Sequence, residues 1–269
     1  AESRTLAHGT DPLSGGFIEL SGHRTLKVRG DIRVAGGTLL LDPTDITIGD
    51  GADCDATVCE VDLEGQLSSG TNVALIASNS ITLENLSDNL LDGRSSTAQS
   101  SLFMGIGSGT SEADFVRGSG GSILFLDAGD TIAASERIKL VSGANEGQLN
   151  LGSLLAHEIK LQAGGSIQAQ NLDAIGTRIE VFGEGGDILL GGVTARHDEA
   201  AAGSVQIDIR NTGTGGITTG NIDGSSDAGS SGAGNVSVQL QTGDGNIRTG
   251  NVTVSSRNTG GGANAYRSQ

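Results

Sequence analysis

The sequence predicts an all-β fold, a right-handed parallel β-helix (β-solenoid) in which short strands and Gly or Asn corners wind into stacked rounds. Three observations lead to this prediction. An eight-residue motif recurs five times in the second half of the chain, a short alternating segment recurs with it, and the composition combines 45 Gly with only 2 Pro among 269 residues. A period of about twenty residues built from short strands and glycines is typical of a solenoid.

The repeated motif has the form Gly-x-(Ile/Leu)-x-x-(Gly/Gln)-x-(Ile/Leu/Val). Its copies begin at Gly147, Gly165, Gly186, Gly215 and Gly245. Glycine reaches positive φ without the steric cost that other residues meet, so we expect the chain to turn a corner at these positions. Three short strands and their corners use about twenty residues, which agrees with the period.

The alternating segments supply the interior of the predicted coil. Neighbouring side chains of a strand point to opposite faces, so the apolar positions turn inward while Lys139, Lys160 and Glu180 face water. Successive rounds should stack about 4.8 Å apart as parallel strands, and parallel crossovers are almost always right-handed. We expect one continuous interior ladder formed by Ile138, Ile159, Ile179, Val205 and Val236.

The same pattern extends toward the N-terminus. After an irregular lead-in at 1–14, residues 15–48 contain five short apolar segments, at 17–20, 26–28, 32–34, 38–41 and 46–48, and we expect the first rounds there. The segment 73–81 aligns with 159–167, with Asn79 at the corner position of Gly165, and Asn tolerates left-handed conformations. Residues 15–269 are therefore predicted to form a single β-helix.

Residues 88–120 interrupt the period. They contain runs rich in Ser, Thr and Gly at 95–101 and 105–111, and rounds are predicted on both sides of them. We expect a loop insertion at one corner, with a short helix near Leu90, and smaller loops at 196–203 and 224–234. Such loops leave the stack intact and often carry binding in repeat proteins.

The run Gly15-Gly-Phe-Ile-Glu-Leu-Ser-Gly22, followed by Gly37-Thr-Leu-Leu-Leu-Asp-Pro-Thr-Asp-Ile-Thr-Ile48, resembles the segment that filamentous-haemagglutinin-type exoproteins carry after their secretion domain. The continuation at 72–89, 121–125 and 130–133 resembles the large cyanobacterial members of this family. The resemblance covers about residues 15–255. It implies a secreted or cell-surface protein, exported across the outer membrane by a two-partner transporter. The family's secretion domain, with its Asn-Pro-Asn-Gly-type motif, is not among these residues, so this segment is not the part that the transporter reads.

Charge and apolar patterning bear on the partners. The formal net charge is −16, whereas nucleic acids and anionic membranes bind clustered Lys and Arg. No apolar run reaches the length of a membrane span, and no signal peptide opens the chain at Ala1. We therefore expect neither a nucleic-acid partner nor membrane insertion, and we expect the chain to be a piece of a longer protein.

Cys54 and Cys59 lie in a polar loop with four residues between them. In an exported protein this spacing favours a disulfide that closes a small loop. Free thiols are the alternative. A zinc site is not favoured, because no second cysteine pair and no nearby histidine complete four ligands.

The same loop is acidic, and its carboxylates are ligands of the kind that calcium uses. The spacing fits neither a helix-loop-helix calcium site nor a calcium-binding β-roll, so a solvated loop is the favoured interpretation and calcium binding is left open. The carboxylates belong to Asp50, Asp53, Asp55, Glu60 and Asp62.

Arg29, Gly30 and Asp31 form a tripeptide that some animal adhesion receptors recognise. The tripeptide lies between two predicted strands, where a Gly-Asp corner is expected in any case. It is a candidate adhesion motif that corner chemistry also explains.

The sequence favours a protein that is not an enzyme. Many parallel β-helices cleave acidic polysaccharides, with clustered carboxylates beside a basic group or a metal. Here the four histidines are scattered, and Trp is absent. We expect a structural or adhesive shaft, without metal or cofactor, whose partners are neighbouring solenoid segments or copies placed end to end in an extracellular fibre. A fragment of a polysaccharide-active β-helix enzyme is the alternative, and the sequence identifies no surface glycan or protein ligand.

Overall fold

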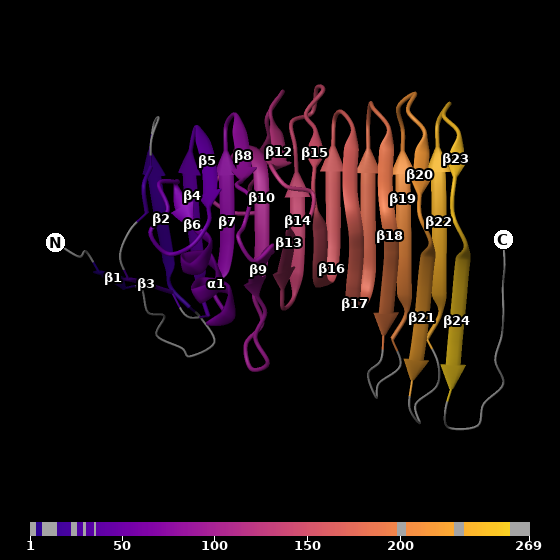
Figure 1. The fold of residues 1–269 in the computed structure, drawn as a ribbon, viewed down its shortest axis with the longest axis horizontal. Helices are drawn as coiled ribbons and strands as arrows, with labels where there is room; N and C mark the ends of the chain where they lie inside the picture. The colour runs from indigo at the N-terminus through magenta and orange to yellow at the C-terminus, as the bar shows by residue number, and fades with distance from the viewer. Residues whose placement is uncertain are drawn as a thin grey trace.

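The chain forms a parallel β-helix in the computed structural model, which describes residues 4–6, 15–22, 26–28, 31–34, 36–197, 203–228 and 234–258. Twenty-two strands belong to one continuous hydrogen-bonded sheet that winds around a long axis, so that the described rounds follow one another from the N-terminal to the C-terminal end (Figure 1). The predicted fold class is confirmed.

Each round contributes to three stacked sheets, because the winding sheet turns at its corners. The first sheet stacks β2 (Phe17–Gly22), β4 (Thr38–Pro43), β7 (Asn72–Ala77), β10 (Ser101–Ser108), β14 (Arg137–Val141), the end of β16 (Ser153–Ala163), the end of β17 (Ile167–Gly183), β19 (Val205–Asn211) and β22 (Val236–Thr242).

The second and third sheets follow along each round. The second stacks β5 (Asp45–Gly49), β8 (Ser80–Leu83), β12 (Ser122–Phe125), β15 (Leu149–Asn150), the starts of β17 and β18 (Ile188–His197), β20 (Ile217–Thr219) and β23 (Ile247–Arg248). The third stacks β9 (Leu90–Gly93), β13 (Thr131–Ala134), the start of β16, the middle of β17, the end of β18, β21 (Ile222–Ala228) and β24 (Val252–Asn258).

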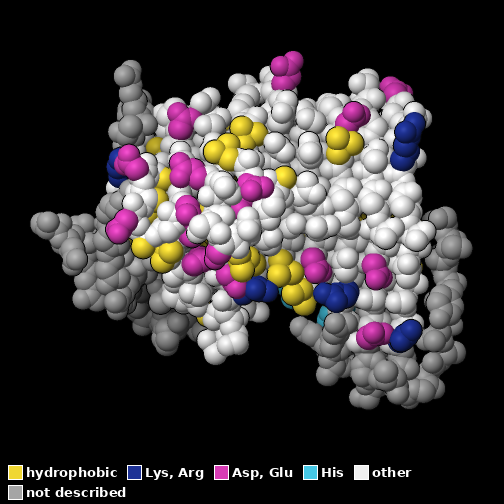
Figure 2. Space-filling view, in the orientation of Figure 1, with side chains coloured by type: hydrophobic (Ala, Val, Ile, Leu, Met, Phe, Trp, Pro, Cys, Tyr) yellow, Lys and Arg dark blue, Asp and Glu magenta, His cyan; other side chains and the backbone are white. Residues whose placement is uncertain are grey.

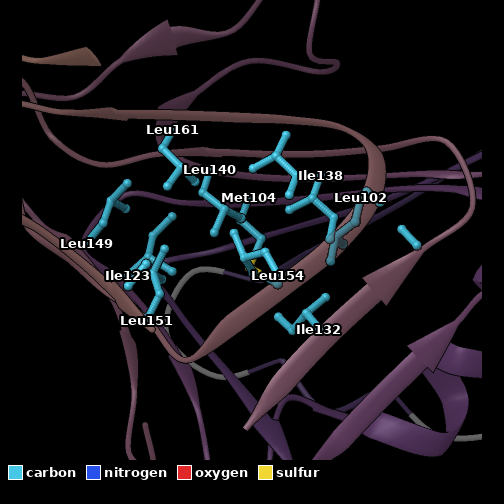
Figure 3. Close-up of a cluster of buried hydrophobic side chains, with 14 of the residues drawn as sticks. Leu102, Met104, Ile123, Ile132, Ile138, Leu140, Leu149, Leu151, Leu154 and Leu161 are labelled. Carbon is cyan, nitrogen blue, oxygen red and sulfur yellow. The ribbon is translucent and has the colours of Figure 1, made fainter. Parts of the chain in front are cut away.

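The repeated motif is confirmed as two interior ladders. Its first apolar position forms the ladder Leu149, Ile167, Ile188, Ile217 and Ile247 in the second sheet. Its second apolar position forms the ladder Leu154, Leu172, Val193, Ile222 and Val252 in the third sheet. Both ladders contribute to a single apolar core, part of which Figure 3 shows between the three sheets.

The ladder of the first sheet is confirmed in part. Ile138, Ile159 and Ile179 pair in register as predicted, but the next partners are Ile207 and Val238. Val205 and Val236 were therefore placed wrongly, two residues too early. A shift of two residues keeps a side chain on the same face of a strand, so the apolar pattern alone does not distinguish the two registers.

The corner glycines have a different role from the one predicted. Only five described glycines have a positive φ, and Asn79 has none, whereas Asn89 and Glu146 do. At the corners the backbones of successive rounds touch instead. A Cβ on Gly215 would lie 2.3 Å from the carbonyl oxygen of Gly186, and one on Gly245 would lie 2.2 Å from that of Gly215. Glycine is required there because the stacked corners leave no room for a side chain.

Residues 88–120 are not a loop insertion. The segment contains β9 and β10, which pair with the following rounds through Leu91 to Ile132 and Leu102 to Ile138. No helix forms near Leu90, which begins a strand. Two parts of the segment lie outside the stacked strands: the connection at 94–100, which contains most of the run rich in Ser and Thr, and the end of the segment (Figure 1). This end turns back through β11 (Val116–Arg117), which pairs with β10 in antiparallel fashion.

A helix forms about thirty residues before the predicted position near Leu90, in a segment for which the repeat pattern predicted no helix. The helix α1 (Glu60–Ser68) follows β6 (Val58–Cys59), which pairs with the end of β5. Leu63 and Leu67 of α1 are fully buried in the core, and an added Cβ on Gly93 would meet the side chain of Leu67. The helix therefore covers the free edge of β9, the first strand of the third sheet.

Two further N-terminal expectations differ from the structure. Residues 26–28 form no strand, although the Val28 amide donates to the Thr57 carbonyl oxygen at 2.7 Å. The strand β3 (Asp31–Arg33) pairs only with β1 (Arg4–Leu6), in a separate two-stranded sheet. Of the smaller loops, the parts at 196–197 and 224–228 belong to β18 and β21, and 198–202 and 229–233 lie outside the described residues.

Candidate functional site

Charged side chains cover the outer face of the first sheet in its middle rounds. Glu158 and Lys160 of β16 lie beside Arg178 and Glu180 of β17, because these residues pair in register while their apolar neighbours point inward. Lys160 contacts Glu158 at 3.2 Å and Glu180 at 3.3 Å, and Arg178 also pairs with Glu180. The four side chains form a square in which charge alternates along and across the strands. We call it the charge square.

The neighbouring rounds extend this pattern. In β19, Asp208 pairs with Arg210 at 2.7 Å. In β14, Arg137 and Lys139 both pair with Glu112, and the Lys139 contact is 3.2 Å. Glu112 does not belong to the stack and comes from the turn between β10 and β11. Lys139, Lys160 and Glu180 point outward as the strand alternation predicts, but their ion pairs with Glu112 and with each other were not part of that prediction.

Residues 109–118 fold back over the outer face as a strap. Phe115 of the strap packs edge-on against Phe103, with 5.0 Å between ring centres, and Lys139 lies 5.5 Å from the Phe103 ring. Phe115 covers a second apolar cluster on the outside of the first sheet, made of Leu40, Ala74, Ile76, Phe103 and Val141.

Hydrogen bonds within the strap stabilise its start, and contacts with the rest of the chain hold its end. At its start the hydroxyls of Ser111 and Thr110 donate to Asp114, and these hydrogen bonds hold the pKa of that carboxyl well below its usual range. At its end Arg117 donates to the Ser142 carbonyl oxygen at 2.6 Å and to Glu184 at 2.6 Å. The sequence predicted this segment to be part of a loop insertion at one corner. Phe103 and Phe115 are the sequence signal for this packing, because an apolar ring on the outer face of a sheet needs a partner that covers it.

The outer face of the middle rounds is cross-linked by ion pairs. Each of the five carboxylates on this face has a cationic partner within the same chain, and four of the ion pairs join residues of different strands or of the strap. The ion pairs of this face therefore fasten neighbouring rounds and the strap to one another.

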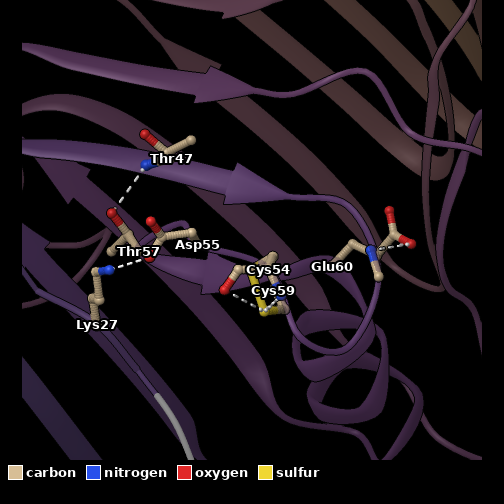
Figure 4. Close-up of a disulfide and its surroundings, with 8 residues drawn as sticks. Lys27, Thr47, Cys54, Asp55, Thr57, Cys59 and Glu60 are labelled. Carbon is tan, nitrogen blue, oxygen red and sulfur yellow. Dashed lines mark hydrogen bonds and ion pairs between the residues drawn. A yellow bond between two sulfur atoms is a disulfide. The ribbon is translucent and has the colours of Figure 1, made fainter.

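The disulfide loop lies at the N-terminal end of the core (Figure 4). Cys54 and Cys59 are joined by a disulfide with 5.6 Å between their Cα atoms. The loop is held against its surroundings by an ion pair between Lys27 and Asp55 and by the Thr47 amide, which donates to the Thr57 hydroxyl at 3.1 Å. Because Cys59 is the residue that precedes α1, the disulfide fixes where that helix begins.

Glu60 is the most unusual carboxyl group of this loop. Its side chain is buried, one oxygen accepts the Gly51 amide at 3.2 Å, and the other has no hydrogen-bond partner. Burial raises the pKa of Glu60, and the nearby Asp50 and Asp88 add to the effect, although the bond from Gly51 opposes it. The acid therefore favours its neutral form more than a solvated glutamate does.

Asp130 lies close to the same acidic corner. It is fully buried, and the Leu86 amide donates to it at 3.3 Å. Burial raises its pKa, and Asp127 and Asp50 contribute repulsion. On the face drawn in Figure 2, acidic side chains gather over the N-terminal half of the molecule.

The acidic corner shows no ligand cage for calcium. In the part of the chain that the structure describes, no three His, Cys, Asp or Glu side chains are grouped so as to hold a metal ion. The loop is also less solvated than predicted, because Glu60 is buried and begins a helix. Of the candidate adhesion motif, Arg29 and Gly30 lie outside the described residues, and Asp31 begins β3.

A shallow depression of about 460 Å³ lies at the corner after β2 and β4. It is lined mainly by Ser21, Asp42, Pro43 and Ser78. Burial and the neighbouring Glu19 raise the pKa of Asp42. The depression offers hydroxyl groups and one carboxyl group but no aromatic surface, and it lies far along the stack from the charge square.

Comparison with known proteins adds no assignment. Among the described residues, no helix is long and apolar enough to cross a membrane. No protein-family model, no curated protein and no solved structure matches the chain.

Proposed function

We propose that the chain is a non-enzymatic structural or adhesive shaft of a secreted or cell-surface exoprotein of the filamentous-haemagglutinin type. The observation that carries this proposal is the unbroken stack of the first sheet, in which nine strands pair in parallel from β2 to β22. At about 4.8 Å per round, eight steps extend about 38 Å along the axis. Such a stack separates its two ends by a fixed distance.

The stack also resists bending and shear. The rounds share one core from Ile18 to Ile222, and ion pairs fasten the outside of the middle rounds. A solenoid of this kind is stabilised chiefly by contacts between neighbouring rounds. Rounds can therefore be added or removed while the contacts within the remaining stack stay the same. This is the property that a spacer or fibre needs.

The last described round supports a partner that continues the stack. Val252 is 48% exposed, whereas Ile222, its partner in the preceding round, is fully buried. Ile247 is likewise 43% exposed beside a buried Ile217. A further round of the same pattern, from a neighbouring solenoid segment or a second copy, would cover these side chains and pair with the outer edges of β22 and β24.

Export tests the proposal directly. An epitope placed at the exposed residues Ser96 and Thr97, between β9 and β10, should become accessible to antibody on intact cells of the organism that makes the protein. Deletion of the partner transporter should keep the epitope inside the outer membrane, while total protein is still produced. Retention in the cytoplasm of the unmodified strain would contradict the proposal.

A second assay separates shaft from enzyme. The purified chain is incubated with acidic and neutral polysaccharides, and new reducing ends are measured beside a Glu180→Gln variant. No turnover is expected for either protein. Turnover that the variant loses would instead support the alternative of a polysaccharide-active enzyme and would refute the non-enzymatic assignment.

A further inference from the structure

The helix α1 takes the place that a strand would fill in the first round of the third sheet. Between β5 and β7 the chain forms no strand of that sheet, whose first member is β9. Leu63 and Leu67 of α1 are fully buried, and the Glu64 carboxylate accepts the amide of Asp92 in β9 at 2.7 Å. The amide of an edge strand otherwise pairs with a further strand. The helix therefore closes this end of the third sheet.

By itself α1 is a weak helix. It has nine residues, and an isolated helix shorter than about 12 residues is marginal in water. Its interior contains Gly65, a residue of low helix propensity. Within α1 no basic residue lies in the last turn, and the N-cap residue Cys59 makes no side-chain hydrogen bond to the first turn. The position of the helix therefore depends on its contacts with the rest of the chain and on the disulfide at its start.

We propose that the disulfide between Cys54 and Cys59 is a redox-sensitive latch for this helix. Small thiols open the disulfide by attack on Cys54, and the reduced chain releases α1 from the edge of β9 while the later rounds stay folded. The two sulfurs differ in access, because Cys54 is partly exposed and Cys59 is fully buried. Thiol–disulfide exchange depends on access to the sulfur that is attacked, so Cys54 is the point of attack.

The reaction uses two thiol groups, which supply both electrons. The first thiolate forms a bond to Sγ of Cys54, the bond between the two cysteine sulfurs breaks, and Cys59 leaves as a thiolate that takes up a proton. A second thiolate then attacks the external sulfur of this mixed disulfide. Cys54 leaves as a thiolate and takes up a proton, and the two external thiols are oxidised to a disulfide.

The disulfide acts on the start of α1 rather than on the whole stack. The two cysteines are five positions apart in the sequence, and Cys59 directly precedes the helix. Opening so short a loop returns chain entropy to the released state and favours that state by a factor of about 30. Each round of a solenoid is stabilised by its neighbours, so release of an element at one end leaves the later rounds paired.

Hydrogen–deuterium exchange of the purified chain, measured by mass spectrometry with and without dithiothreitol, tests the proposal. On reduction the amides of α1 and the Asp92 amide should exchange about 30 times faster, because α1 detaches more often. The paired strands β17 and β18 are the matched internal control, and their amides should exchange at an unchanged rate. Removal of dithiothreitol and reoxidation should restore the slow exchange.

A brief exposure to glutathione identifies the attacked sulfur. After the reaction is stopped with acid, fragment masses should place the glutathione adduct on Cys54. The Cys54→Ser/Cys59→Ser variant, whose fold circular dichroism checks, should exchange fast at α1 without any thiol and should not respond to dithiothreitol. If this variant does not fold, the measurements on the unmodified chain decide. Equal acceleration in α1 and β17, no acceleration in either, or an adduct on Cys59 would refute the proposal.

Discussion

Replacing Gly164 by Ala tests whether the corner glycines are required for close packing of the backbone. A Cβ at Gly164 would lie 2.0 Å from the carbonyl oxygen of Ala144 in the preceding round, and real Cβ atoms essentially never approach within 3.0 Å of another heavy atom. The two backbones would have to separate by about 1 Å. The hydrogen bond from the Gly164 amide to the Gly143 carbonyl oxygen, 3.1 Å long, would then be lost.

The following round prevents Gly164 from moving away. A Cβ on Gly185 would lie only 2.3 Å from the Gly164 carbonyl oxygen, so the corner is in contact on both sides. Overpacking of a dense interior costs about 1–3 kcal/mol, and a lost hydrogen bond costs about 1 kcal/mol more. We expect the free energy of unfolding to fall by about 2–4 kcal/mol.

Two other glycines are the matched controls. Gly51 has a φ of +72° with open space around it, and Gly120 has open space without a positive φ. Gly120→Ala should stabilise the protein by about 0.4–1 kcal/mol, because alanine restricts the unfolded chain. At Gly51 the same gain is offset by about 1–2 kcal/mol for the left-handed backbone.

Guanidinium unfolding monitored by circular dichroism ranks the three variants. Gly120→Ala should unfold at the highest denaturant concentration, Gly51→Ala near the unmodified protein, and Gly164→Ala at the lowest. If Gly164→Ala proved as stable as Gly120→Ala, the corners would not be in van der Waals contact as the structure places them.

Three further predictions concern the core, the disulfide and the acidic corner. Ile159→Asp should lower the free energy of unfolding by about 4 kcal/mol or more, since it buries an unpaired charge, whereas Gln168→Asp on the exposed side should change it little. Equal effects in thermal unfolding would contradict the assignment of faces. Material recovered from outside the cell should gain alkylated mass at Cys54 and Cys59 only after reduction, and breaking this six-residue loop should cost about 2 kcal/mol; thiols that alkylate without reduction would defeat the prediction. Glu60→Gln should be more stable than the unmodified protein at neutral pH. A carboxyl whose pKa is raised above 4.5 by folding contributes stability at low pH and loses it as the pH rises, so the difference should vanish toward pH 4.5, and a pH-independent difference would count against the raised pKa.

The interior was predictable because a strand has a period of two and the motif keeps its own spacing. The Gly-x-Ile motif at 186–193 and at 215–222 places Ile188 on Ile217 and Val193 on Ile222, as the pattern predicts. The alignment of 73–81 with 159–167 is also correct, since Val73 and Ile159 belong to one ladder through Leu102 and Ile138.

The outer features were not predictable in the same way. The helix α1 has few apolar residues, and only Leu63 and Leu67 mark its buried side. The strap is held by the contact of Phe115 with Phe103 and by the ion pair of Glu112 with Arg137. These contacts do not recur at a fixed spacing in the sequence, so the repeat pattern does not predict them. The segment 88–120 was misread because half of the residues of β10 are Gly or Ser, although residues 102–105 of this strand pair with rounds on both sides.

The register of the first sheet shows where the missing information lies. Within the strand, Val205 and Ile207 are equivalent, because both face inward and both are apolar. The two residues differ in their distance along the sequence from the corner that follows. Ile159 and Ile179 stand six and seven residues before their motif glycines, and Ile207 stands eight before Gly215, whereas Val205 stands ten before it. Asn211 fixes that corner by donating to the carbonyl oxygens of Gly186 and Gly215 at 2.8 and 3.0 Å. The contacts of the corner therefore hold the register of this round, which the alternating apolar pattern of the strand leaves open.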